Sequence, residues 1–476
     1  MTDPHFAPLV EQAAAIRAKK ISPVELIDVH LSRIAKLNPS LNAYISVAAD
    51  SARAQAIAAA DALAHPKSTS SSVGPLHGVP LSIKSSFEVK GWRTECGSQL
   101  RKNYFATEDA VIVKRLRDAG AIFLGSTNVP EFLMAYETDN LLYGRTNNPW
   151  DLTRTPGGSS GGEATAIAAG ISAGGIGSDG GGSIRIPAHY SGICGFKPTP
   201  GRIPATGHYP ASAGPFAQLG VVGPMARTVA DLIALFDVIA GYDVGDPASA
   251  PIATRHPSDA DTRKLRVGFF EDDGSTPVTD ETSVAVRAAA EGLRAQGFAI
   301  DTWHPRNMKR VWQLWWNLFG RGVQMAIEPT VDGRESELSP IYTAFRATVN
   351  AEPRLTTQDL LNTLLGRDAL RGLILERMEE FPILVSPVCA IPAFRHRERN
   401  WTVRGQKVEY FKAMSYSQWW NILGFPAAVV PFAQSHEGLP IGVQIIGRPW
   451  HDEEVLAVAA HVERAGFGFR PPPNVA

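Results

Sequence analysis

Apolar positions near the start of the chain recur at the spacing of amphipathic helices. Residues 22–25 have the sequence SPVE, in which serine, proline and glutamate stand in the order that caps and starts a helix. The apolar residues that follow, at intervals of four and three, are Ile27, Leu31 and Ile34. We expect Pro39 to end this helix. The alanine-rich residues 52–64 predict a second helix.

Short apolar runs then alternate with a helical pattern. Residues 79–83 predict a buried strand that leads into Lys84. Residues 107–119 predict a helix that ends before Gly120, and residues 121–124 predict a second buried strand. Because a strand–helix–strand order is typical of α/β proteins, we expect a central sheet covered by helices.

A second pattern of this kind follows a segment that is rich in Pro, Ala, Ser and Asp. That segment, residues 245–263, predicts a surface connection. Beyond it, residues 264–270 predict a strand and residues 283–296 predict a helix. Taken alone, this pair fits either a second α/β domain or an extension of the first sheet.

Composition argues against several classes of protein. The 476 residues include 46 basic and 47 acidic side chains, so no basic excess indicates nucleic-acid binding. No run reaches the ~18 apolar residues of a membrane span, and the N-terminus lacks the pattern of a secretory signal. The three cysteines, Cys96, Cys194 and Cys389, are far apart, which is typical of reduced thiols in a cytoplasmic protein. No Cys-x-x-Cys or His-Glu-x-x-His spacing indicates a metal site.

Glycine and serine concentrate in one part of the chain. Eleven of the 26 residues from Gly157 to Gly182 are glycine, although glycine weakens both helices and strands. This density indicates backbone that approaches another group closely with its amides exposed. Two serines stand out in this region, Ser159 and Ser183, and 24 positions separate them. A serine beside free backbone amides suits acyl transfer, because the amides stabilise an oxyanion.

Three other interpretations of this segment fit less well. Residues 157–161 match the Gly-x-Ser-x-Gly motif of α/β-hydrolases, but residues 147–156 before them do not predict the strand that this motif needs. Residues 175–180 match the dinucleotide fingerprint Gly-x-Gly-x-x-Gly, but Pro187 follows where a helix should run. Glycines that serve packing alone would leave the two serines and the upstream lysine unexplained.

These motifs together resemble the amidase signature family, and the resemblance covers nearly the whole chain. It rests on residues 78–84 (GVPLSIK), 127–132 (TNVPEF), 157–163 (GGSSGGE), 178–187 (SDGGGSIRIP), 195–199 (GFKPT) and 438–447 (GLPIGVQIIG). The resemblance implies a single domain with a large central mixed sheet and helices on both faces. Its parts are N-terminal helices (1–70), a signature core (about 75–240), a variable region that shapes the substrate pocket (about 264–410) and a return to the core sheet (about 411–476).

The resemblance also implies the chemistry, residue by residue. Ser183 is the implied nucleophile, Ser159 the bridging serine after a cis peptide bond, and Lys84 the base. The amides implied to form the oxyanion hole are those of Gly180, Gly181, Gly182 and Ser183. The residues implied to support this site from behind are Asp179, Arg185 and Ser160. All three catalytic positions are intact, which argues against an inactive family member, and the resemblance implies neither a metal nor another cofactor.

The surroundings of Lys84 decide whether it can act as a base. Only a neutral amine accepts a proton, so burial must lower the lysine pKa from ~10.4 by about 3 units. The apolar strand before Lys84 suits such burial. Many family members carry Asp-Asn after this lysine, whereas this chain has Ser85 and Ser86. The polarity around the amine is therefore where this chain departs from the family.

Aromatic residues indicate where a substrate could bind. Those at helical spacing on one face are Trp312, Trp315, Trp316 and Phe319, and Trp419 belongs to a second patch. They form either a helix face packed on the core or an apolar wall of the substrate pocket. The second interpretation predicts an apolar or aryl substrate.

We therefore expect an amidase for small or linear amides, whose chemistry also extends to carbamates (urethanes) and esters. The alternative is the A subunit of a tRNA-dependent amidotransferase, which passes ammonia to a partner. The aromatic middle region favours the free-standing enzyme over that component. The expected partner is a small-molecule substrate, and we expect binding to neither nucleic acid nor membrane. The sequence does not decide between a monomer and a homodimer.

Overall fold

Eleven strands of the chain form one mixed sheet. The structure is a computed structural model that describes residues 3–65 and 73–475. In spatial order the strands are β1 (Tyr44–Val47), β3 (Ile122–Thr127), β2 (Pro80–Lys84), β4 (Gly174–Asp179), β6 (Val221–Ala226), β5 (Cys194–Lys197), β12 (Ala427–Gln434), β13 (Pro440–Gly447), β9 (Ile383–Pro387), β7 (Val267–Phe269) and β8 (Ile300–Thr302). β2 is parallel to β3 and β4, β7 is parallel to β8 and β9, and the other pairs are antiparallel. The predicted α/β fold with a large mixed sheet is confirmed.

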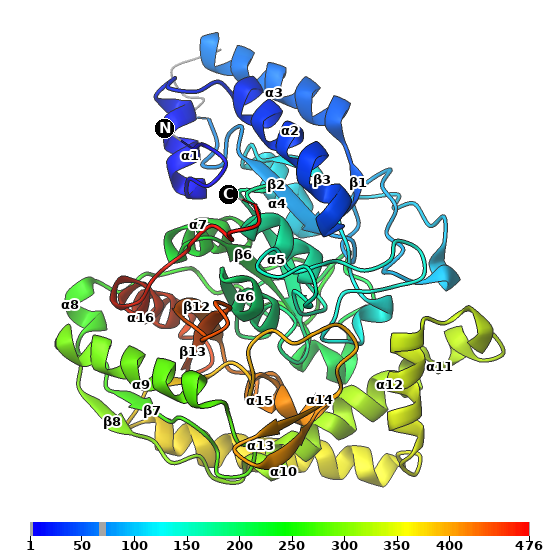
Figure 1. Ribbon diagram of the computed structural model, residues 1–476, viewed down its shortest axis with the longest axis vertical. Helices are drawn as coiled ribbons and strands as arrows, with labels where there is room; N and C mark the ends of the chain where they lie inside the picture. The colour runs from blue at the N-terminus through cyan, green and yellow to red at the C-terminus, as the bar shows by residue number, and fades with distance from the viewer. Residues whose placement is uncertain (1–2, 66–72, 476) are drawn as a thin grey trace.

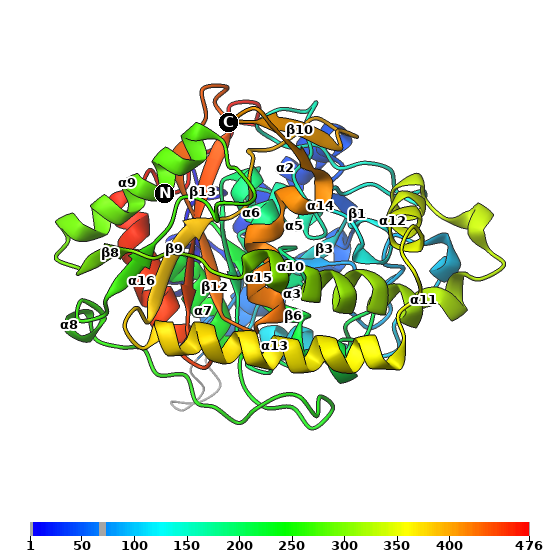
Figure 2. The same ribbon diagram turned by 90° about the horizontal axis from the view of Figure 1, so that it is seen from below.

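Helices cover both faces of this sheet (Figure 1). They are α7 (Val229–Ile239), α9 (Asp280–Ala295) and α16 (Asp452–Ala465) on one face and α5 (Gly161–Ala168) and α6 (Arg185–Ser191) on the other. Figure 2 shows α9 and α16 on one side of β9, β12 and β13, with α6 on the opposite side. Successive side chains of a strand serve the two faces, so Val429 and Val430 belong to different apolar cores.

Three helices precede β2 in the sequence, of which the second and third pack together beside β3 and the first contacts α7. They are α1 (Leu9–Arg17), α2 (Pro23–Leu41) and α3 (Ala49–Ala64), and residues 1–2 and 66–70 of the predicted N-terminal region lie outside the described residues. The predicted capping box is confirmed, because the Ser22 hydroxyl accepts from the Glu25 amide and the Glu25 carboxylate accepts from the Ser22 amide. The prediction that Pro39 ends the helix is wrong. Pro39 lies in the last turn, where its missing N–H removes one bond only, and the helix ends before Asn42, which adopts a left-handed conformation with φ 50°.

The strand–helix–strand pattern before the glycine-rich segment is also confirmed. The helix is α4 (Val111–Asp118), which begins four residues later than predicted, and β2 and β3 lie on either side of it in the sequence. Within the predicted surface connection, a short helix occurs, α8 (Asp259–Thr262). The second strand–helix pair, β7 and α9, joins the same sheet through β9. The single domain stays a prediction, and this shared sheet supports it.

The variable middle region adds helices that share an apolar core with α5 and α6 (Figures 1 and 2). They are α10 (Met308–Trp315), a π-helical segment (Trp316–Gly322), α11 (Val323–Val331), α12 (Pro340–Asn350) and α13 (Thr357–Met378). The hairpin β10 (Asn400–Val403) and β11 (Gln406–Glu409) precedes α14 (Tyr410–Ala413) and α15 (Ser415–Ile422). Among residues 3–65 and 73–475, no helix is both long enough and apolar enough to cross a membrane.

Candidate active site

The ends of two parallel strands bring the candidate residues together. β2 ends at Lys84 and β4 ends at Asp179, and the two strands pair in parallel. The carboxyl ends of parallel neighbours meet at one edge of a sheet, which is where α/β proteins place their ligands. The glycine-rich residues 180–182 follow β4 directly and lead into α6.

The Lys84 amine lies at the centre of a cluster of hydroxyl groups. Its Nζ is 2.7 Å from the Ser159 hydroxyl oxygen and 2.9 Å from those of Ser160 and Ser178. The side chain has no exposed surface, and burial lowers the pKa of Lys84 to about 7 against the opposing effect of nearby acidic groups. Near neutral pH a substantial fraction of this amine is therefore uncharged, which is the form that a base requires.

The two serines 24 positions apart in the sequence line one cavity. The peptide bond between Gly158 and Ser159 is cis, and the Ser160 amide donates to the Ser183 carbonyl across 3.2 Å. Ser159 and Ser183 both line a cavity of about 350 Å³. Within the described part of the chain no hydrogen bond joins their hydroxyls, so proton transfer between them needs a rotation of a hydroxyl-bearing side chain.

Hydrogen bonds hold the carbonyl groups of the glycine loop away from the cavity. The Trp315 indole Nε1 donates to the Gly180 carbonyl across 2.9 Å, and the Tyr136 hydroxyl donates to the Gly181 carbonyl across 2.9 Å. Neither glycine has room for a side chain, because an added Cβ would lie 2.5 Å from Phe319 at position 180 and 2.6 Å from Trp315 at position 181. In a trans peptide the N–H points opposite to the carbonyl, so these contacts fix where the amides point.

The amide of Gly182 has a different partner from the one that the resemblance implies. It donates to the Asp179 carboxylate across 2.7 Å and so does not remain free. Among the residues that the structure describes, the amides of Gly180, Gly181 and Ser183 have no acceptor. Three backbone donors of the described chain therefore remain unpaired in the loop that ends at Ser183.

A buried ion pair anchors the loop from behind. The Arg185 guanidinium donates to both carboxylate oxygens of Asp179, across 3.0 and 2.9 Å, and both side chains are fully buried. Although burial alone would raise it, this guanidinium holds the pKa of Asp179 well below its ordinary value. The Asn421 amide also donates to Asp179, and Gln444 accepts from Arg185 across 2.7 Å.

Sequence reasoning missed Asn421 and Gln444 as parts of this anchor. Gln444 interrupts the apolar run of residues 441–446, and a polar residue buried in such a run needs a partner. That interruption is the local feature of the sequence that marks Gln444 as a buried residue with a polar partner. Asn421 offers no such feature, because nothing in its local sequence indicates contact with a loop about 240 positions earlier.

The two serines that replace Asp-Asn after the lysine are both buried. Within the described residues the hydroxyls of Ser85 and Ser86 have no hydrogen-bond partner. A buried carboxylate near the amine comes instead from Glu163 on α5, which accepts from the Ser82 and Thr127 hydroxyls. Burial raises the pKa of Glu163 to about 7.

The structure distributes the four aromatic residues of the predicted helix face, and Trp419 of the second patch, over different places. Only Phe319 among them lines the cavity of Ser159 and Ser183. Trp312 and Trp316 line a second cavity of about 430 Å³. Trp315 is fully buried behind the glycine loop, and Trp419 is buried against Tyr416.

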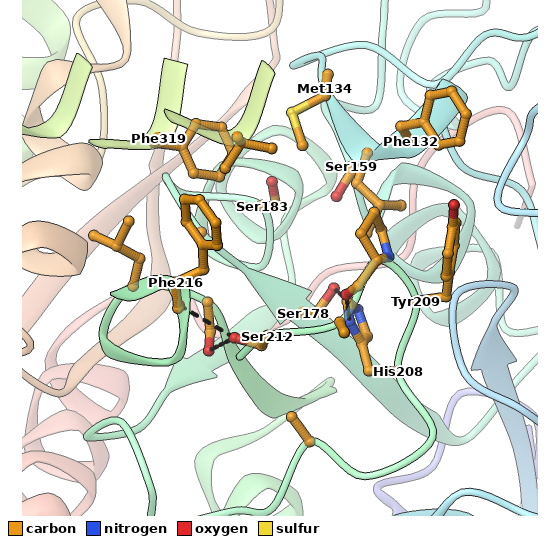
Figure 3. Close-up of a pocket in the computed structure, with 18 of the residues that line it drawn as sticks. Phe132, Met134, Ser159, Ser178, Ser183, His208, Tyr209, Ser212, Phe216 and Phe319 are labelled. Atoms are coloured by element: carbon orange, nitrogen blue, oxygen red, sulfur yellow. Dashed lines mark hydrogen bonds between the residues drawn. The ribbon is translucent and has the colours of Figure 1, made fainter. Parts of the chain in front are cut away.

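The cavity walls come mostly from residues that sequence reasoning did not single out. Figure 3 shows Phe216 with Phe319 on one side of the two serines and Phe132 with Tyr209 on the other. Met134 also contributes to this wall, and Ser178 and His208 lie side by side below Ser159. None of these residues belongs to a motif that marks a binding wall, so their roles follow from the fold alone. The result is a largely apolar pocket with hydroxyls at one end.

This combination of a buried amine, two serines and free backbone amides on an α/β scaffold is typical of serine hydrolases that replace the histidine base by lysine. The family model described as Amidase matches residues 25–456. The chain therefore belongs to the amidase signature family.

Named relatives span nearly the whole chain. The indoleacetamide hydrolase of Bradyrhizobium diazoefficiens is 35% identical and the match covers 96% of this chain and 86% of that protein. The acylamidase of Rhodococcus erythropolis is 34% identical, with 96% and 95% covered. The A subunit of the glutamyl-tRNA(Gln) amidotransferase of Chloroflexus aurantiacus is also 34% identical, with 98% and 97% covered.

Solved structures show the same fold. A bacterial aryl acylamidase of the amidase signature family superposes with a TM-score of 0.86 at 27% identity, and the match covers 97% of this chain and 96% of that one. The A subunit of the glutamyl-tRNA(Gln) amidotransferase of Thermotoga maritima superposes with a TM-score of 0.77 at 26% identity, with 99% and 98% covered.

Proposed function

We propose that this protein hydrolyses the C–N bond of small or linear apolar amides, aryl amides above all, through an acyl-enzyme on Ser183. The observation that carries the proposal is the contact of 2.7 Å between the Lys84 amine and the Ser159 hydroxyl, with Ser183 in the same cavity. The lowered pKa of Lys84, about 7, supplies a base near neutral pH.

The proposed reaction moves one proton along the three side chains. Neutral Lys84 accepts the Ser159 proton while Ser159 accepts the Ser183 proton, and the Ser183 oxygen bonds to the substrate carbonyl carbon. The amides of Gly181 and Ser183, together with that of Gly180, donate to the oxyanion that forms. Collapse breaks the C–N bond, and the proton returns through Ser159 to the leaving nitrogen.

Water completes the cycle by attacking the acyl-enzyme. The same relay takes a proton from that water, and the tetrahedral intermediate collapses with Ser183 as leaving group. The carboxylic acid product then leaves, and both serines regain their protons. Esters and carbamates carry the same carbonyl centre, so we propose that they are attacked as well.

The pocket supports an apolar or aryl substrate. Aromatic side chains provide large rigid contact areas for a planar ring, and Phe132, Phe216 and Phe319 all line the cavity. The relatives named indoleacetamide hydrolase, acylamidase and aryl acylamidase agree with this class.

The alternative is the A subunit of a tRNA-dependent amidotransferase. The relative of that name is as similar in sequence as the acylamidase, at 34% identity. The superpositions favour the free-standing enzyme, because the TM-score is 0.86 for the aryl acylamidase and 0.77 for the amidotransferase component. The cavity is largely apolar, which suits an aryl group better than the polar side chain of glutamine.

One assay separates the two functions. The purified chain alone is given a nitroanilide, an aryl ester, an aryl carbamate and glutamine, with product and ammonia measured in each case. We expect turnover of the aryl substrates and none of glutamine. Ammonia from glutamine without turnover of any aryl substrate would favour the amidotransferase component.

A further inference from the structure

A histidine in the cavity wall has a defined hydrogen-bonding state. The Nδ1 of His208 is 2.8 Å from the Pro210 carbonyl oxygen, which can only accept, so Nδ1 carries the proton. Burial and the nearby Lys84 amine lower the pKa of His208 to about 3, so the ring is neutral. Nε2 of a neutral ring protonated on Nδ1 has no hydrogen and acts only as an acceptor.

Ser178 connects this histidine to Lys84. The Ser178 hydroxyl oxygen is 2.9 Å from His208 Nε2 and 2.9 Å from Lys84 Nζ (Figure 3 shows the serine beside the histidine). A hydroxyl has one proton to donate, and His208 Nε2 is a bare acceptor. The Ser178 proton therefore points to His208, and toward Lys84 this hydroxyl oxygen can only accept.

The consequence concerns the lone pair of the neutral amine, which has two hydrogens and one lone pair. Two acceptors on Ser178 face it, the hydroxyl at 2.9 Å and the carbonyl at 3.3 Å. Ser160 can donate its own proton to the Ser178 carbonyl across 3.4 Å, which leaves its oxygen as a further acceptor. With the amine hydrogens directed to these groups, the lone pair is left for the Ser159 hydroxyl at 2.7 Å.

We propose that His208 is a positioning residue that acts through Ser178 to point the lone pair of Lys84 at the Ser159 proton. The inference rests on the proposed function, in which Lys84 is the base. Without the acceptor on His208, the Ser178 hydroxyl can rotate and donate to the amine. It then competes with Ser159 for the same lone pair, and the fraction of enzyme poised for proton transfer falls.

The substitution His208→Phe tests this role. Phenylalanine retains a ring that can pack edge-on against Phe87, whose centroid is 5.0 Å from the histidine ring, but it has no acceptor. We expect kcat on an aryl ester to fall by about tenfold on the high-pH plateau, as for loss of one net hydrogen bond. We expect KM to change by less than about twofold, because the reacting carbonyl still meets the same amides.

The substitution His208→Gln is the matched control. Its amide carbonyl can accept from Ser178 while its amino group donates to the Pro210 carbonyl, so both histidine contacts are replaced. We expect kcat within about threefold of the parent, since acceptor and donor are both restored. Equal losses of kcat in the Phe and Gln variants, with parental melting temperatures, would overturn the proposal. So would a rise in KM at constant kcat, which indicates a role in substrate contact.

A double-mutant cycle shows whether Ser178 is the connection. Ser178→Ala removes the hydroxyl that His208 orients, so adding His208→Phe should cause no further loss of kcat. Losses that multiply in the double variant would contradict an action through Ser178. Lys84→Ala, assayed beside them, keeps the two hypotheses apart. Parental activity in Lys84→Ala overturns the proposed function, whereas an inactive Lys84→Ala with a fully active His208→Phe overturns this inference alone.

Discussion

The indole Nε1 of Trp315 donates to the carbonyl oxygen of Gly180 across 2.9 Å. A residue that the sequence pattern assigns either to the core or to the pocket wall is thus fully buried behind the loop that precedes Ser183. Because the amide of Gly181 belongs to the same peptide unit as that carbonyl, Trp315 fixes the direction of a proposed oxyanion donor. The aromatic helix face serves the site from behind at this position.

We predict that Trp315→Phe lowers kcat/KM about tenfold. Phenylalanine fills most of the volume but cannot donate, so the peptide between Gly180 and Gly181 can turn and misdirect its amide. Steady-state kinetics on an aryl ester measure the effect. Trp316→Phe is the matched control, because it also removes an indole donor, to Glu352, but at the second cavity. Similar losses in both variants would show that the effect comes from packing rather than from the loop.

We predict that Phe319 and Trp312 differ in their effect on substrate preference. Phe319→Ala should raise KM for bulky aryl amides more than for acetamide, since Phe319 lines the cavity of the two serines. Trp312→Ala should leave the ratio of the two KM values, aryl amide to acetamide, unchanged, because Trp312 lines the other cavity. The measurement is kcat/KM for both substrates in each variant. A larger shift for Trp312→Ala would identify the second cavity as the substrate site.

The backbone explains why the sequence could not separate these aromatic residues. Trp312 stacks with Trp316 and Trp315 stacks with Phe319, so the face consists of two neighbouring rows. Periodicity places both rows on one side of a helix but does not say that one row faces the glycine loop. The change to π-helical geometry at Trp316 also shifts the residues that follow.

The elements that the sequence did predict are those with local causes. The capping box at Ser22 and the strand into Lys84 depend on neighbouring residues, and both are confirmed. The proposed triad could be named because each member stands in a contiguous motif. His208 stands in no motif, and its partners are fixed only when β4 and the loop after Gly207 meet in the fold. Long-range polar contacts of this kind are not encoded in local patterns.

We predict that a serine-directed phosphonate labels Ser183 and that Ser183→Ala abolishes labelling and turnover. Ser183 follows the glycine loop, and the amides of Gly180, Gly181 and Ser183, unpaired within the described residues, are the proposed donors to the charged adduct. Mass spectrometry of the digested protein locates the label. Ser159→Ala should slow labelling strongly, because the proposed path to Lys84 passes through its hydroxyl. A label on Ser159 in the parent enzyme would exchange the roles of the two serines.

We predict that activity survives removal of divalent metals. In the part of the chain that the structure describes, no three His, Cys, Asp or Glu side chains gather as metal ligands, and the proposed base is an amine. Dialysis against a strong chelator, followed by the ester assay, tests this. The control is a chelator-treated sample to which Zn²⁺ or Mg²⁺ is returned. Activity that is lost and then restored by one of these ions would contradict the prediction.

Finally, we predict that activity rises with pH around neutrality and that Lys84 is the cause. Its pKa of about 7 means that the amine is mostly protonated below pH 7 and mostly neutral above it. Since only the neutral amine accepts the Ser159 proton, kcat/KM should fall about tenfold per pH unit well below 7 and level off above 8. The pH dependence of kcat/KM on a substrate that does not titrate gives the midpoint.

Variants at Lys84 test the assignment of that midpoint. In Lys84→Ala, hydroxide or water must take the proton, so the plateau should give way to a continuing rise with pH. The free amides should keep some rate above background, on the order of 10³-fold as in other enzymes that lack their triad. Lys84→Arg should also fail near pH 7, because a guanidinium stays protonated there. If either variant retained the parental kcat at pH 7 with an unchanged unfolding transition, Lys84 would not be the base.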